Sequence, residues 1–189
     1  MKTIMKSVFI LTVATTAVAF TTTPMKKRID IKESSIEWKG KKILGSHTGT
    51  INLKEGYLEV DGDDLVGGMF VVDMTSLKNT DLSGENRAKL EGHLKSDDFF
   101  GVASYPTASL VINSATKKGN VHTVSADLTI KGTTNPITFE LIMGETAART
   151  SLKIDRTQYG VRYGSGSLFD SLGDNTISDN FELDVLLKF

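Results

Sequence analysis

The stretch Val121–Met143, VHTVSADLTIKGTTNPITFELIM, decides the fold. Apolar and polar side chains alternate in its first half, and the alternation resumes after the break at 131–136. Because successive side chains on a strand point to opposite faces, both halves are predicted to be strands that share one apolar side. The Gly and Pro in the break favour a turn, so the two strands form an antiparallel pair. Two strands are not stable alone in water, and the rest of the chain must complete the sheet.

Further alternating segments lie on both sides of this pair. The chain has 189 residues, which is enough for one domain. No alternation of strands with helices occurs, which disfavours a parallel sheet and leaves an antiparallel barrel or sandwich of about eight strands. A barrel of this size encloses side chains or one small ligand. The further strands are expected near residues 35–39, 47–53, 57–60, 65–74, 110–112, 151–155 and 177–189.

One helix and two local features are predicted between these strands. The helix begins near Gly84, and Ser83 is expected to cap it. The segment Leu65–Met74 is apolar on both faces, so we expect the helix to cover its outer side. Lys54–Gly56 is predicted to be a hairpin turn, because glycine adopts the positive φ that tight turns need.

The first 19 residues have the pattern of a secretory signal peptide. Lys2 and Lys6 precede the short apolar run Val8–Leu11, and the segment ends with Ala17–Ala19. The apolar run is too short to cross a bilayer, so no permanent membrane anchor is expected. An N-terminal anchor or a buried strand is the alternative. Residues 20–33 show no pattern and are predicted to be a tail.

Charge and cysteine content restrict the partners and the compartment. Cleavage of the signal peptide removes two lysines and no acid, which changes the formal net charge from −1 to −3. A mildly acidic mature protein disfavours both nucleic acid and an anionic membrane surface as its main partner. The chain has no cysteine, which excludes disulfides, thiol catalysis and a lipid-modified N-terminal cysteine. We expect a periplasmic or secreted protein.

Three motifs together resemble signatures of the YceI-like family. They are His93–Phe100 followed by Tyr105–Pro106, then Leu128–Thr134, and finally Asp155–Gly160. The resemblance implies that residues 34–189 form an all-β domain, an eight-stranded antiparallel lipocalin-like barrel with a short helical flank. It also implies secretion to the periplasm and an enclosed polyisoprenoid chain, such as the tail of an isoprenoid quinone.

The predicted function is the binding, storage or transport of a long-chain isoprenoid-like lipid. Each buried methylene of such a guest contributes roughly 0.8 kcal/mol, so a long chain overcomes the cost of its immobilisation without a charged anchor. The alternative is that the inward side chains simply fill the barrel. The alternation nominates as ligand-binding Ile36, Trp38, Phe70, Val72, Leu110, Ile112, Leu128, Ile130, Phe139, Leu141, Phe181, Leu183 and Val185.

Other chemistry finds little support in the sequence. His47, His93 and His122 lack the short spacing of a metal site, and His93 is expected to hydrogen-bond backbone near the helix end or to favour the helix dipole there. Asp155–Arg156 is expected to hold a loop through an ion pair or hydrogen bonds to carbonyls. No catalytic or cofactor motif is present, so we predict a protein that is not an enzyme and has no cofactor beyond a bound polyisoprenoid or quinone. A lipid- or peroxide-acting enzyme using His93, or a filled structural module, remains the alternative, and the oligomeric state is left open.

Overall fold

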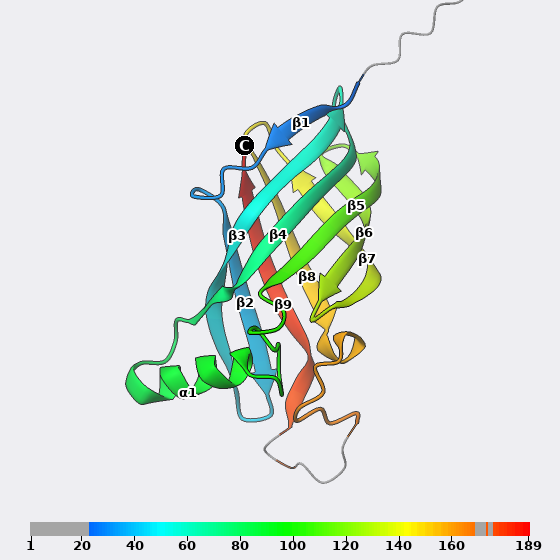
Figure 1. Ribbon diagram of the computed structural model, residues 1–189. Helices are drawn as coiled ribbons and strands as arrows, with labels where there is room; N and C mark the ends of the chain where they lie inside the picture. Colours follow the sequence, from blue (N-terminus) through cyan, green and yellow to red (C-terminus); the bar gives the residue numbers. More distant parts are fainter. Residues whose placement is uncertain (1–22, 169–172, 174–175) are drawn as a thin grey trace, which may run out of the picture.

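The computed structural model describes residues 23–168, 173 and 176–189, and these form one β-barrel with a helix at one end (Figure 1). The expected signal peptide, residues 1–19, lies outside the described residues. Within them, no helix is both long and apolar enough to cross a bilayer. The elements are β1 (Met25–Arg28), β2 (Ser35–Lys42), β3 (Gly45–Asp61), β4 (Asp64–Asn79), α1 (Gly84–Lys95), β5 (Thr107–Lys118), β6 (Val121–Ile130), β7 (Thr133–Met143), β8 (Ala147–Asp155), the 3-10 helix η1 (Arg156–Tyr159) and β9 (Ile177–Lys188).

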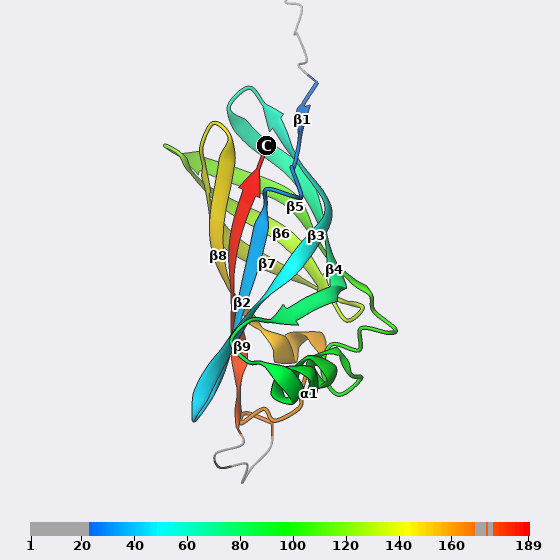
Figure 2. The ribbon, with the colours of Figure 1, turned by 90° about the vertical axis from the view of Figure 1, so that its left-hand side faces the viewer.

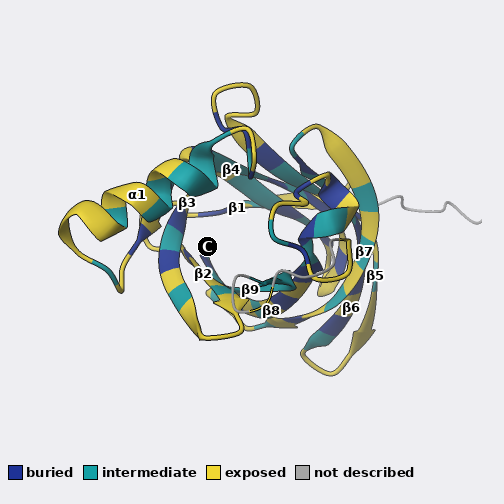
Figure 3. Ribbon diagram, turned by 90° about the horizontal axis from the view of Figure 1, so that it is seen from below, coloured by how far each residue is buried: buried dark blue, intermediate teal, exposed yellow. Residues whose placement is uncertain are grey.

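Strands β2 to β9 form a closed antiparallel ring, which confirms the predicted eight-stranded barrel. Each strand pairs with the next in the chain from β2 to β9, and β9 pairs back onto β2. The β6–β7 hairpin that decides the fold has Val124 opposite Phe139. Lys131 and Gly132 at its tip both adopt positive φ, as a two-residue hairpin turn requires. Viewed along the barrel from the α1 end, the strands encircle the interior (Figure 3).

Part of the segment expected to be a tail is instead the short strand β1. Its residues pair with Tyr57–Val60 of β3, beyond the part of β3 that pairs with β2. The Lys26 ammonium lies 3.3 Å from the Glu59 carboxylate and 4.0 Å from the centre of the Tyr57 ring. The strand is therefore held by backbone pairing and by contacts of basic side chains, neither of which produces an apolar alternation in the sequence.

The turn predicted at Lys54–Gly56 is wrong, because β3 continues through it to Asp61. The pairing of β3 with β4 shifts between Leu53 and Glu55, which marks a β-bulge rather than a chain reversal. The glycine serves packing instead. A Cβ at Gly56 would lie 2.8 Å from the ring of Phe70, so only glycine lets this ring pack against the β3 backbone.

Helix α1 begins at Gly84 as predicted, but it does not cover the outer face of Leu65–Met74. Ser83 makes no side-chain capping bond. Glu91 accepts a hydrogen bond from the backbone N–H of Asn79, and Lys95 donates one to the carbonyl of Thr75, so the helix lies against the end of β4. Figures 1 and 2 show α1 at the end of the barrel away from the C-terminus. The apolar outer residues of β4 are instead left uncovered, with Met69 and Val71 half-buried and Val66 exposed.

Candidate ligand-binding cavity

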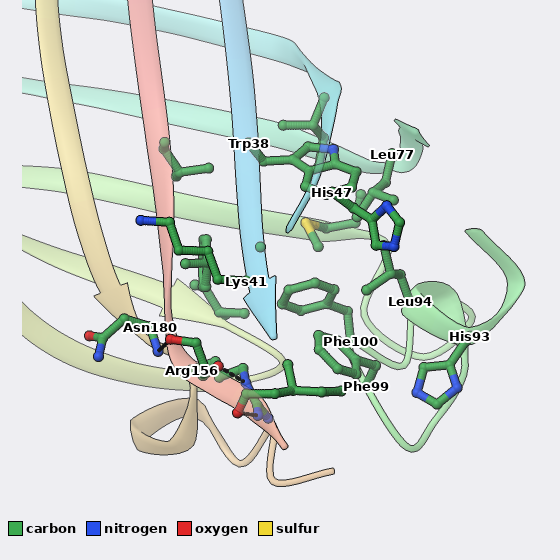
Figure 4. A pocket seen from close by; sticks show the side chains of 18 of the residues that line it. Trp38, Lys41, His47, Leu77, His93, Leu94, Phe99, Phe100, Arg156 and Asn180 are labelled. Carbon is green, nitrogen blue, oxygen red and sulfur yellow. Dashed lines mark hydrogen bonds between the residues drawn. The ribbon is translucent and has the colours of Figure 1, made fainter. Parts of the chain in front are cut away.

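A cavity of about 650 Å³ occupies the barrel interior at the α1 end (Figure 4). Its walls come from β2, from the start of β3, β5 and β9, from the ends of β4 and β6, and from the inner side of α1, where His93 is among the lining residues. The walls are apolar, whereas the rim carries basic and aromatic side chains. No aspartate or glutamate is among the residues that line it.

All thirteen residues nominated by alternation belong to the hydrophobic interior, but only some lie on the cavity. Those on the cavity come from the strand halves near α1. The others do not line it and pack elsewhere against the hydrophobic core. On the cavity are Ile36, Trp38, Val72, Leu128, Ile130, Phe181 and Leu183, and in the rest of the interior are Phe70, Leu110, Ile112, Phe139, Leu141 and Val185.

The segment after α1 adds a wall that the alternation did not nominate. Phe99 and Phe100 meet edge to face with their centres 5.1 Å apart, and Phe100 meets Phe181 of β9 at 6.1 Å. The labelled side chains in Figure 4 show both rings beside the cavity below Leu94. The adjacent pair of phenylalanines in an otherwise polar segment was the sequence signal for this wall.

Arg156 holds the loop that forms another side of the mouth. Its side chain is 2% exposed, and its guanidinium donates hydrogen bonds to the carbonyls of Val161, Ile177 and Ser178. The carboxylate of Asp179 lies 3.8 Å away. Burial lowers the pKa of Arg156, an effect that the nearby carboxylates oppose. This confirms the predicted role of Arg156 as a loop anchor, and it shows that the residue also lines the cavity.

Asp81, in the connection between β4 and α1, is bonded to the start of β3. Its carboxylate lies 2.8 Å from Nδ1 of His47 and accepts a hydrogen bond from the backbone N–H of Thr48. The side-chain amide of buried Asn79 donates to it as well. Burial acts to raise the pKa of Asp81, but these hydrogen bonds outweigh it and lower the pKa to about 2.

The three histidines lie apart, and the described residues contain no metal-binding cluster of His, Cys, Asp or Glu. The backbone hydrogen bond expected for His93 is not formed. Its ring instead meets those of Phe99 at 5.7 Å and Tyr163 at 4.5 Å, and its Nε2 has no partner among the described residues. His93 does lie in the last turn of α1, where a positive charge favours the helix dipole. His122 is buried, outside the cavity lining.

The barrel wall is least tightly paired between β7 and β8. Only Ile142 with Arg149 and Met143 with Ala148 pair across this seam, next to the hairpin turn. Further along, the two strands flank a smaller hollow of about 320 Å³ that Phe139 helps to line. Among the described residues, no strand pairing closes this part of the wall.

Comparison with known proteins identifies the family. Residues 28–189 match the YceI-like domain. A UPF0312 protein of Shewanella denitrificans is 32% identical over 49% of this chain and 47% of its own length. Protein YceI of Escherichia coli O157:H7 is 39% identical over 33% of this chain and 32% of its own length. The chain thus spans less than half of the length of these curated relatives.

Solved structures share the fold. Burkholderia cenocepacia BcnA superposes with a TM-score of 0.67 at 20% identity, covering 84% of this chain and 98% of its own. A polyisoprenoid binding domain from Saccharophagus degradans superposes with a TM-score of 0.59 at 19% identity, covering 85% and 95%. At such identities the likeness concerns the fold alone. The match of the family model over residues 28–189 shows that the chain belongs to the YceI-like domain family.

Proposed function

We propose that this protein binds a long-chain isoprenoid-like lipid in the barrel cavity and stores or carries it. The observation that supports the proposal most strongly is the cavity itself, because an apolar hollow of about 650 Å³ lies where a filled barrel would have side chains. A folded protein loses packing energy around such a hollow, and an apolar guest restores it. The related Saccharophagus degradans domain, described as polyisoprenoid binding, is consistent with the same class of guest.

The volume of the cavity sets the length of chain that it encloses. A methylene group needs about as much space as a water molecule in the liquid, roughly 30 Å³. The cavity of about 650 Å³ therefore takes about twenty carbon atoms, or four isoprene units. A longer guest, such as a quinone tail, extends out of the mouth beyond this number.

Extraction of the purified protein tests the proposal. The protein is isolated without detergent, extracted with organic solvent, and the extract is analysed by mass spectrometry. Delipidated protein is then titrated with a polyprenol and an isoprenoid quinone. We expect a co-purifying isoprenoid or saturable uptake of the added one. Recovery of no lipid, together with no uptake, contradicts the proposal.

An enzyme on the same barrel is the second candidate, and His93 separates it from a carrier. The His93 ring contacts Phe99 and Tyr163, and no ion pair with a carboxylate involves it among the described residues. His93→Ala should therefore leave guest uptake within a few-fold of wild type. Turnover of an added lipid or peroxide that disappears in this variant, while the fold is retained, would establish the enzyme instead.

The same proposal places the carrier outside the cytoplasm. The pattern of residues 1–19 supports it. Fractionation of cells that express the full chain, with N-terminal sequencing of the product, tests it. Cleavage after Ala19 and recovery in the periplasm or medium is the expected result.

A further inference from the structure

Two large apolar side chains project into solvent at the tip of the β2–β3 hairpin. Ile43 is 62% exposed and Leu44 is 71% exposed, which makes Leu44 the most exposed of the large hydrophobic residues that the structure describes. They form the turn between Lys42 and Gly45 and contribute nothing to the core. Adjacent exposed aliphatic residues at a loop tip are costly in water unless they meet an apolar partner.

This tip lies beside the mouth of the cavity. The backbone N–H of Ile43 donates to the carbonyl of Thr176, and Lys42 pairs with Ile177 of β9. A backbone bridge joins Ile177 to Ser165 in the neighbouring loop. The hairpin and the loop therefore form one rim, and Figures 1 and 2 show both at the end opposite the C-terminus.

The neighbouring loop adds two further apolar side chains to this rim. Tyr163 is 49% exposed and Leu168 is 48% exposed. Tyr163 also lines the cavity, so the exposed apolar surface is continuous with the cavity wall. We call Ile43, Leu44, Tyr163 and Leu168 the apolar rim.

Basic side chains accompany the apolar rim. Lys42 and Arg162 are exposed, and neither forms an ion pair among the residues that the structure describes. Lys41 is paired with Glu182. Basic residues next to exposed aliphatic and aromatic ones are the pattern of interfacial segments that enter the headgroup region of a bilayer with anionic lipid.

We propose that the apolar rim docks on the surface of a lipid bilayer that contains anionic lipid, so that the cavity mouth faces the membrane. Ile43 and Leu44 enter the boundary between headgroups and acyl chains, while Lys42 and Arg162 lie among the phosphates. An apolar guest then passes between bilayer and cavity without crossing water. The formal net charge, −1 for the whole chain and −3 after the expected cleavage, disfavours an anionic surface as a general partner. The proposed contact is confined to one end of the barrel, where Lys42 and Arg162 are exposed, and salt screens the more distant charges.

The absence of cysteine from the chain allows a direct test. Leu44→Cys is labelled with a polarity-sensitive fluorophore and mixed with vesicles of phosphatidylcholine, with or without phosphatidylglycerol. The matched control is labelled Val66→Cys, an exposed position by the β3–β4 hairpin at the other end. We expect a blue shift and brighter emission at position 44 with phosphatidylglycerol vesicles and none at position 66. No change at position 44, or an equal change at both, overturns the proposal.

Vesicle sedimentation gives the second readout. Ile43→Ser with Leu44→Ser should weaken partition by at least about tenfold, because two buried aliphatic side chains are lost. Val66→Ser with Ile142→Ser, which removes two exposed apolar residues at the far end, should leave it unchanged. Lys42→Glu should reduce the preference for phosphatidylglycerol. Equal binding of both double variants, or a dimer through the rim in place of vesicle binding, contradicts the proposal.

The inference rests on the proposed function, and guest uptake from solution separates the two. The variant with Ile43→Ser and Leu44→Ser, two residues that do not line the cavity, should take up a soluble isoprenol as wild type does and lose only transfer from vesicles. Uptake without any vesicle binding by wild type refutes docking and leaves the carrier role intact. Vesicle binding without uptake of any isoprenoid refutes the carrier role.

Discussion

A substitution that puts a larger side chain into the cavity should block the guest without destabilising the fold. Ala108 of β5 lines the cavity, opposite Val72 of β4. Ala108→Phe adds six carbon atoms to a space that takes about twenty. At roughly 0.8 kcal/mol for each displaced methylene the upper limit is about 5 kcal/mol of lost binding energy. A guest that shifts towards the mouth recovers part of this, so we expect affinity to fall at least tenfold, which is about 1.4 kcal/mol.

The fold gives an independent readout of the same substitution. Because the added ring enters empty space, the melting temperature of the guest-free Ala108→Phe protein should stay the same or rise. The matched variant is Ala126→Phe on β6, where the side chain is fully buried outside the cavity. Overpacking there should cost about 1–3 kcal/mol. Each kcal/mol lowers the melting temperature by about 2–4 °C for a chain of this size.

Calorimetric titration with a polyprenol and thermal unfolding followed by circular dichroism measure the two effects. Two outcomes refute the reasoning. Ala108→Phe could bind the guest as tightly as wild type, which would place the guest elsewhere. It could also unfold as early as Ala126→Phe, which would mean that the α1 end of the barrel is filled.

Three further predictions concern the rim and the wall. Asp81 has a folded pKa of about 2 against an ordinary 3.8, so it stabilises the fold above pH 4 and loses this contribution as the pH falls towards 2. A third of the Asp81 side chain is exposed, so solvent screening reduces its contribution, and Asp81→Asn should lower the free energy of unfolding at neutral pH by about 1–2 kcal/mol. The variant should also lose less stability than wild type between pH 4 and pH 2, which urea titrations at several pH values would show. Arg156→Lys replaces a planar guanidinium, whose three nitrogens each donate to a different carbonyl, by a single ammonium nitrogen. The variant should lose about 2–4 kcal/mol in urea unfolding, and an unchanged midpoint would contradict the anchor role. Amides of 137–140 and 151–154 that face the seam should exchange with deuterium faster than those of 123–129, and equal protection would show that the seam is paired.

The barrel was predictable because alternation reports directly which side chains face inward. Every nominated residue does belong to the interior, and the turn at Lys131–Gly132 was marked by its glycine. The short strand β1 was not predictable in this way. Its basic residues carry no alternation, and it forms only because β3 extends past β2 and offers a free edge.

The position of the cavity could not be predicted from the sequence. A cavity forms where side chains from opposite walls of the barrel do not reach one another, and the alternation does not report this distance. Leu128 lines the cavity, whereas Val124 on the same face of the same strand is fully buried outside it. Nothing in their side-chain types distinguishes them. The mouth of the cavity is likewise formed by segments that lie far apart in the sequence. Arg156 reaches it because its guanidinium donates hydrogen bonds to the carbonyls of Ile177 and Ser178 in β9.

The chain-length dependence of binding tests the central claim most directly. Isoprenols of ten, fifteen, twenty and twenty-five carbons are titrated into the delipidated protein by calorimetry. We predict at least a tenfold gain in affinity for each isoprene unit up to about twenty carbons, and little gain beyond, because the cavity of about 650 Å³ is then full. Affinity that does not change with chain length, or no binding at any length, would contradict the claim that the hollow of this barrel holds an isoprenoid chain.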